Sequence, residues 1–230
     1  MSNLAQLRDR VEQAMLDMTN AVFPTGVIDE ALRQVLDQYS AALPLAMETV
    51  LSLPGAGREI ALDGVAGLLS VHEVWWPYDS AASQETWPPN RVRGFRLLWD
   101  DARPLLFLDL HDGPQPQQGD EVRLWYTRRH AIQDLDGGDI TSLPLPHESM
   151  LVLGASGQAA FSRALDLIEI AGTDLYQVGL LGAWGQRRLR EFQAWLKQVQ
   201  EQEARGGPAW GAGWPLDRWE QRRPLFGRLQ

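Results

Sequence analysis

VIDEALRQVLDQYSAALPLAMETVLSL, residues 27–53, contains the change of period that decides the fold. Its first part repeats apolar residues at three- and four-residue steps, which is the spacing of one face of an α-helix. These residues are Ile28, Ala31, Leu32, Val35, Leu36, Tyr39 and Leu43. Pro44 closes the helix, because the residue before a proline disfavours helical geometry. METVLSL (47–53) then reads as an extended run, so the stretch predicts a helix that leads into a β-strand.

Another helix is predicted on the N-terminal side of this stretch. Leu4, Leu7, Val11, Ala14, Met15 and Met18 recur with the same spacing. Ser2 or Asn3 is available as its N-cap, because both side chains can accept a hydrogen bond from the first helical turn. Pro24-Thr25-Gly26 separates the two helices.

Short extended runs follow on the C-terminal side. They are REIAL (58–62) after a predicted hairpin turn at PGAG (54–57), LLSVHEVWWP (68–77), RGFRLLW (93–99), PLLFLDL (104–110) and DEVRLWYTRRH (120–130). The pair Asp100-Asp101 falls where a turn joins the third and fourth of these runs, and turns favour aspartate. In the last run Val122, Leu124 and Tyr126 share one face. An antiparallel β unit is therefore expected.

Helices return towards the C-terminus. Residues 147–172 read as a long helix whose small residues Gly154, Gly157 and Ala160 would let another helix approach closely, so it is expected at the centre of the helical part. A linker is predicted at 173–179 and a further helix at 180–204. The expected class is α+β: a four-helix bundle with an inserted antiparallel β unit and an extended C-terminal tail. The corresponding ranges are 1–45 and 131–205 for the bundle helices, 46–130 for the β unit and 206–230 for the Trp/Arg-rich tail.

The chain has an acidic body and a basic C-terminal part. The 230 residues carry a net charge of −9, but residues 1–186 alone carry −13 and residues 187–230 carry +4. An acidic body repels nucleic acid, so specific DNA binding by the body is not expected. The sequence has no cysteine, no apolar run long enough to span a membrane and no signal peptide at its N-terminus.

No catalytic motif is complete. GASGQ (154–158) lacks the final glycine of a nucleophile elbow and lies within a predicted helix. PGAGRE (54–59) lacks the Gly-Lys-Ser/Thr end of a phosphate-binding loop, and GLLGAWG (179–185) does not follow a strand in a βαβ unit. We therefore expect that the chain is not an enzyme and that it has no catalytic residue and no cofactor.

No metal site is predicted either. The acidic stretch at residues 134–139 has aspartates at 134, 136 and 139 but misses the third alternating acid and the closing glutamate of a calcium loop, so it reads as a turn. The histidines are scattered at His72, His111, His130 and His147, without an i, i+4 pair.

The tryptophans permit two interpretations. Trp75, Trp76, Trp99 and Trp125 lie in predicted strands, where packing of the core or of a sheet face is the first reading. An exposed row of them would instead form a platform for a sugar or a receptor. Such a carbohydrate- or receptor-binding module, on a tail-associated protein, is the alternative function.

The order of motifs resembles the head-to-tail adaptor (connector, or neck) proteins of tailed bacteriophages. IDEALRQVLDQYSAALPLAMETVLSLPGAGREIALDGVAGLLSVHEVWWP (28–77) is similar to their opening, in which a "DEAL…L..YS" helix is followed by two strands and an "L.SV..V..P" segment. GDEVRLWYTRRHAIQDLDGGDITSLPLPHESMLVLGASGQAA (119–160) is similar to their strand that ends in Tyr-Thr-x-x-His and leads through a loop to a small-residue helix. The resemblance covers residues 5–175.

The resemblance implies a structural function in the virion. Such adaptors form a ring beneath the portal, commonly of twelve copies, extend the DNA channel without gripping the double-stranded DNA in it, and dock other neck or tail proteins. It implies assembly in the host cytoplasm, no membrane and no catalytic residues.

The tail is expected to hold partners, because large anchors offset the ordering entropy of an extended segment and Trp and Arg often carry binding energy. Its expected contacts with the portal or a neighbouring subunit are Trp210, Trp214, Trp219, Arg218, Arg222, Arg223, Leu225 and Phe226. Folding of the tail onto its own bundle is the other possibility.

Overall fold

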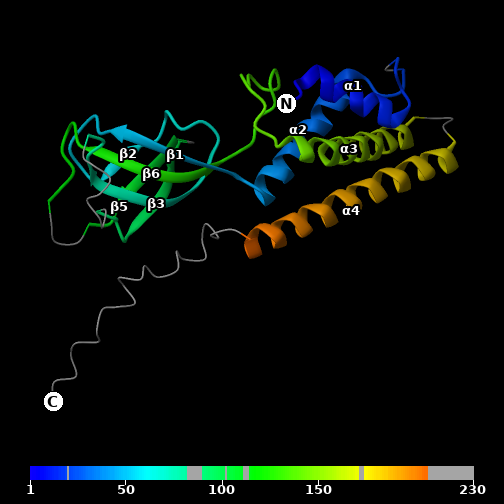
Figure 1. The fold of residues 1–230 in the computed structure, drawn as a ribbon. Helices are drawn as coiled ribbons and strands as arrows, with labels where there is room; N and C mark the ends of the chain where they lie inside the picture. Colours follow the sequence, from blue (N-terminus) through cyan, green and yellow to red (C-terminus); the bar gives the residue numbers. More distant parts are fainter. Residues whose placement is uncertain (20, 82–89, 102, 111–113, 171–173, 207–230) are drawn as a thin grey trace.

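A computed structural model describes residues 1–19, 21–81, 90–101, 103–110, 114–170 and 174–206 (Figure 1). Its elements in chain order are α1 (Leu4–Met15), α2 (Thr25–Ala42), β1 (Leu45–Ser52), β2 (Glu59–Ala61), β3 (Leu68–Tyr78), β4 (Phe95–Asp100), β5 (Arg103–Leu108), β6 (Glu121–Arg128), the 3-10 helix η1 (Leu145–His147), α3 (Glu148–Ile168) and α4 (Leu175–Gly206). The α+β class is confirmed for this part of the chain. Figure 1 shows the α-helices in a helical body and the strands in a β body beside it.

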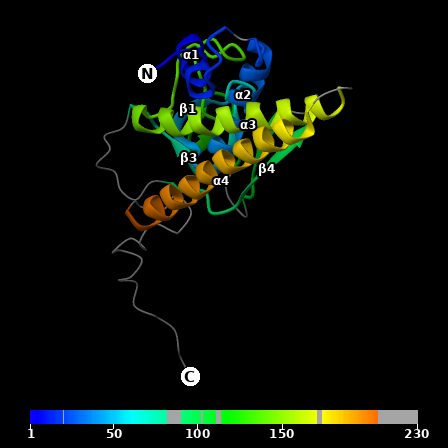
Figure 2. The ribbon, with the colours of Figure 1, turned by 90° about the vertical axis from the view of Figure 1, so that its right-hand side faces the viewer.

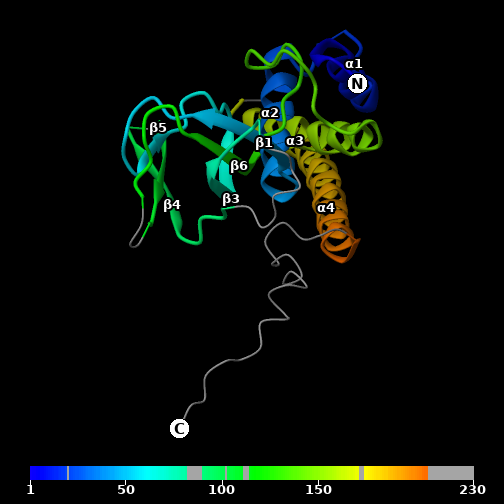
Figure 3. The same ribbon diagram turned by 60° about the vertical axis from the view of Figure 1, so that its left-hand side comes forward.

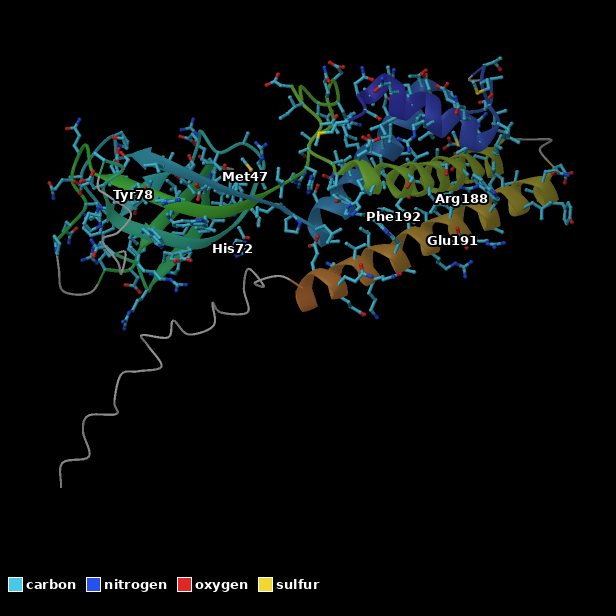
Figure 4. All side chains as sticks on the ribbon, viewed as in Figure 1. Met47, His72, Tyr78, Arg188, Glu191 and Phe192 are labelled. Carbon is cyan, nitrogen blue, oxygen red and sulfur yellow. The ribbon has the colours of Figure 1, made fainter. Side chains whose placement is uncertain are left out.

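α3 is the central element of the helical body and packs against α1, α2 and α4. The small residues predicted to allow this lie at the contacts. A Cβ added to Gly157 would lie 2.9 Å from the carbonyl oxygen of Gly185, and one on Gly154 would lie 2.9 Å from Cγ of Phe192. α4 therefore crosses α3 almost backbone to backbone (Figure 2), and the fully buried Phe192 ring lies between the two helices (Figure 4).

The N-terminus is tied to the start of α3. Asn3 caps α1 in a capping box with Gln6, which confirms one of the two predicted caps. Ser2 instead donates from its backbone N–H and its hydroxyl to the Glu148 carboxylate, at 2.8 and 2.7 Å. Arg10 of α1 donates to the same carboxylate at 2.8 Å, and the Glu148 side chain is only 1% exposed. This ion pair, which is buried on its Glu148 side, holds α1 against the first turn of α3.

The β body consists of two three-stranded antiparallel sheets, in the orders β1-β6-β3 and β2-β5-β4 (Figure 3). Val122, Leu124 and Tyr126 of β6 are buried on one face, as their alternation predicts. They share one core with residues of the other sheet, such as Ile60 and Leu106. The predicted β4–β5 hairpin is confirmed, with Asp100 paired to Arg103.

The predicted hairpin at PGAG is wrong. β1 pairs with β6 and β2 pairs with β5, so residues 54–57 carry the chain from one sheet to the other. The Pro/Gly composition of residues 54–57 fits any turn, so it did not specify which strands pair.

The linker predicted at 173–179 is also wrong, because α4 already begins at Leu175. Asp174 begins the helix: its carboxylate accepts from the backbone N–H of Tyr176 at 2.9 Å, and its carbonyl accepts from that of Val178 at 3.1 Å. Val178 is buried, which fixes this first turn against α3. α3, by contrast, ends at Ile168, earlier than its apolar pattern suggests.

Candidate functional site

The predicted partner-binding residues lie in the tail, and the tail beyond Gly206 is outside the described residues. These residues are Trp210, Trp214, Trp219, Arg218, Arg222, Arg223, Leu225 and Phe226. A candidate site in the described part must therefore come from other surfaces, and three stand out: the free end of the helical body, the outer face of one sheet, and the junction of the two bodies.

An apolar groove lies between α3 and α4 at the end of the helical body that faces away from the β body (Figure 1). We call it the end groove. Its volume is about 400 Å³. It is lined by Phe161, Ala164, Leu165, Ile168, Leu175, Val178, Gly179, Gly182, Ala183 and Gln186.

The glycines of α4 explain why the groove opens. A Cβ on Gly185 would lie 2.7 Å from the carbonyl oxygen of Gly157, one on Gly182 would lie 3.5 Å from Cβ of Ala164, and one on Gly179 would meet nothing within 4 Å. The two helices therefore diverge from their crossing towards the free end, as helices packed at an angle do. Because Gly179 and Gly182 carry no side chain, the floor of the groove on α4 is backbone.

Large apolar side chains around the end groove are exposed to solvent. Leu165 is 51% exposed, Ile168 55% and Leu175 67%. The connection between α1 and α2, which contains the exposed Leu16 and Met18, lies at the same end of the body (Figure 1). Apolar surface gathered in this way marks a protein-interaction site more often than singly scattered residues do.

The charged residues at this end are mainly acidic. Within residues 161–186 the acids are Asp166, Glu169 and Asp174, and the only base is Arg163. All three acids are exposed. Among the described residues, no charged one lines the end groove itself: the acids belong to the segments at its open end, and Arg187 and Arg188 follow its lining residue Gln186.

The outer face of the β1-β6-β3 sheet carries an aromatic cluster. The rings of Trp75 and Trp125 lie 4.4 Å apart, centroid to centroid. The guanidinium of Arg123 lies 4.6 Å from the Trp125 ring and 5.4 Å from those of Trp75 and Tyr78, and donates to Glu48 at 2.9 Å. The β body carries Tyr78 at the end of β3 (Figure 4).

The other two strand tryptophans lie elsewhere. Trp76 is buried in the core and donates from Nε1 to Asp120 at 3.2 Å, while Trp99 is 57% exposed on β4 in the other sheet. The predicted packing role holds for Trp76. The four rings form no continuous row, and Arg123 already stacks on the pair at the outer face.

A polar network at the junction of the two bodies was not predicted from the sequence. His130, directly after β6, holds the chain leaving α2: its Nε2–H donates to the carbonyl of Leu43 at 3.0 Å and its backbone N–H to the Ser40 hydroxyl at 3.0 Å. The Tyr39 hydroxyl lies 2.7 Å from Nδ1 of His147. The only local signal was a Tyr-Ser pair within the buried stripe of the second helix.

Burial shifts the titration of this network. Burial lowers the pKa of His130, so the neutral ring is favoured, and burial raises the pKa of Tyr39 to about 12. A buried hydrogen-bonded network of this kind fixes geometry. It clamps both chain crossings between the helical and β bodies.

Of the residues weighed for metal binding, His111 lies outside the described residues, and the others are not gathered into one site. Within the described ranges, no group of three or more His, Asp or Glu side chains could hold a metal ion. Asp136, from the acidic turn, forms an ion pair with Arg33 of α2 at 2.7 Å. Within the same ranges, no helix has both the length and the apolar character of a membrane span.

No protein-family model matches the chain, and no curated protein sequence matches it. Among solved structures it is similar to a chain in the neck of an empty gene transfer agent (GTA) particle computed with C6 symmetry, at 16% identity and a TM-score of 0.31, over 78% of this chain and 86% of that chain. It is similar to a chain in the virion of the native GTA particle at 17% identity and a TM-score of 0.29, over 78% and 86% of the two chains. A chain in the neck of the native particle computed with C12 symmetry gives 17% identity and a TM-score of 0.30, over 79% and 86%. At these identities and TM-scores the similarity carries no conclusion about this chain.

Proposed function

We propose that the chain is a structural head-to-tail adaptor of a tailed, phage-like particle. Twelve copies of it form a ring under the portal, extend the DNA channel and dock the next neck or tail component. The protein is part of the virion neck, assembles in the host cytoplasm and catalyses no reaction.

The observation that carries an assembly role is the exposed apolar end of the helical body. A chain free in solution gains nothing from leaving side chains such as Leu175 and Ile168 in water, whereas a subunit of a larger assembly buries them against its neighbours. The choice of the neck among assemblies rests on the motif resemblance over residues 5–175.

The charge distribution supports a channel role. Residues 1–186 carry a net charge of −13, and such a body disfavours contact with phosphate. Double-stranded DNA would therefore pass through the lumen without being held. The basic tail is the part suited to an acidic acceptor.

The tail is the proposed anchor of the subunit outside its own fold. Trp210, Trp214, Trp219 and Phe226, together with Leu225, would fill apolar pockets, and Arg218, Arg222 and Arg223 would pair with acids. The acceptor is the portal or a neighbouring copy of this chain.

Reconstitution with the portal protein of the same genome tests this function. The full chain should co-purify with the portal, and negative-stain images should show a rotationally symmetric ring on it. A chain that forms neither a complex nor a ring would refute the adaptor role.

A truncated chain lacking residues 206–230 tests the anchor in the same assay. It should keep its circular dichroism spectrum and lose the complex. Binding that is unchanged by the truncation would rule out the tail as the anchor while leaving the adaptor role in place.

A further inference from the structure

We propose that the end groove of one copy binds the aromatic and arginine-rich C-terminal segment, residues 207–230, of a second copy. The inference rests on the proposed function, for which it supplies a contact between copies. It also identifies the acceptor as the neighbouring subunit and its site as the space between α3 and α4.

The chemistry of the groove suits aromatic side chains. Its volume of about 400 Å³ falls in the range of ~300–1,000 Å³ that ligand-sized groups fill. Its floor at Gly179 and Gly182 is backbone, which lets a flat ring approach α4 closely, and its walls include the exposed Leu165 and Leu175. An indole that enters would cover these apolar walls and be covered by them.

The charges of the two surfaces are complementary. The segment 207–230 holds four arginines against two acids, for a net charge of +2. Within residues 161–186 the three acids outnumber the single Arg163. Arginine pairs with carboxylates in a bidentate manner, so Asp166, Glu169 and Asp174 can hold the arginines that flank the aromatic anchors.

The length of α4 argues that the segment comes from another copy. The groove at Gly182 lies 24 residues before the last helical residue, Gly206, which is ~36 Å of helix at 1.5 Å per residue. Figure 1 shows that the C-terminal end of α4 lies at the opposite end of the helix from the groove. Trp214 follows Gly206 by only eight residues, which span at most ~29 Å when fully extended.

Trp210, four residues after Gly206, therefore cannot return to the groove of its own chain, and Trp214 could at most touch its near edge at Gln186, ~30 Å from Gly206. Aromatic residues from Trp219 onward could reach its floor, because the 13 residues from Gly206 to Trp219 span up to ~47 Å. A second copy removes this limit, because its groove can face the segment directly. Binding between copies thus uses all the large anchors.

Disulfide cross-linking of full-length chains tests the contact, because the sequence has no cysteine of its own. One chain carries Gly179→Cys, a site where an added Cβ meets nothing within 4 Å. A second chain, of different mass tag, carries Ala212→Cys between Trp210 and Trp214. The matched control replaces Gly179→Cys by Gln198→Cys, an exposed position on α4 outside the groove.

Mild oxidation of the mixed chains should give a covalent dimer of the two tags. The yield should be about tenfold above that of the control pair, and replacing Trp210 and Trp214 by alanine in the segment should reduce it to the control level. Equal yields from the groove and control cysteines would overturn the proposal. So would a cross-link that forms only after the portal is added.

The cross-linking result can be told apart from the result of the portal reconstitution that tests the proposed function. Cross-linking at the groove by a chain that makes no ring on the portal would keep this inference and refute the adaptor role. A ring on the portal without cross-linking at the groove would refute this inference alone.

Discussion

The crossing of α3 and α4 makes a graded prediction for three glycines of one helix. Gly179, Gly182 and Gly185 follow one another at three-residue steps along α4, and each is replaced singly by alanine. The nearest atom to the added Cβ would be beyond 4 Å, at 3.5 Å and at 2.7 Å, respectively. The same chemical change therefore meets open space, ordinary contact and a clash.

The magnitudes follow from two opposing effects. Alanine in place of glycine stabilises a helix interior by ~1 kcal/mol in each variant. At Gly185 the added methyl meets two backbone atoms, the carbonyl oxygen of Gly157 and the N–H nitrogen of Phe161 at 2.8 Å, which cannot rotate away. Overpacking of this kind costs ~1–3 kcal/mol. Gly179→Ala should therefore raise the free energy of unfolding by ~0.5–1 kcal/mol, and Gly185→Ala should fall about 2 kcal/mol below it.

Urea and thermal unfolding followed by far-ultraviolet circular dichroism measure the difference. For a chain of this size 2 kcal/mol corresponds to ~4–8 °C in Tm. Gly182→Ala should fall between the other two variants. A Gly185→Ala variant as stable as Gly179→Ala would refute the close crossing, and with it the account of why the end groove opens.

Three further predictions concern the other features. Glu148→Ala should lower the free energy of unfolding by ~2–3 kcal/mol, because it removes a buried carboxylate that pairs with Arg10; a loss in urea unfolding below ~0.5 kcal/mol would contradict that role. Since burial lowers the pKa of His130 in the folded chain, its contribution to stability is complete above the unfolded pKa of ~6.5 and is lost as the pH falls towards the lowered value. The free energy of unfolding measured in urea should therefore fall on acidification, by at most ~1.4 kcal/mol per pH unit for this group, and less steeply in His130→Asn; equal slopes would remove His130 as the cause. The chain should bind no glycan on an array, because Arg123 stacks on Trp75 and its neighbour; binding abolished by Trp75→Ala would restore the alternative function.

The local sequence pattern was sufficient to predict an element that buries a single face. The stripe from Ile28 to Leu43 and the alternation at Val122 and Leu124 each depend on a single buried face, so period alone identified the helix and the strand. The small residues at Gly154 and Gly157 likewise indicated a close helix contact before the partner helix was known.

Features that depend on distant residues could not be predicted. The Pro/Gly turn at 54–57 has the composition of a hairpin, but the pairing of its strands is decided by β5 and β6, which lie far along the chain. Tyr39 and His147 are 108 residues apart in the sequence, and no residue spacing within either segment predicts their contact. The end groove depends on how far α4 diverges from α3, which sequence alone does not give.

The exposed apolar end of the helical body could not be recognised from the sequence. Leu165 lies in a predicted helix and Leu175 in the predicted linker at 173–179, and both side chains are more than half exposed. An apolar pattern specifies that a face will be covered. It does not specify whether the same chain or another copy covers it.

The neck assignment is tested most directly by a cryo-electron microscopy map of the particle produced from the genome that encodes this chain. We expect a ring of copies between the portal and the tail, with each helical body and β body fitted into density and each end groove covered by a neighbouring copy. Particles that lack the chain, or a map whose portal–tail junction is occupied entirely by other proteins, would contradict the account.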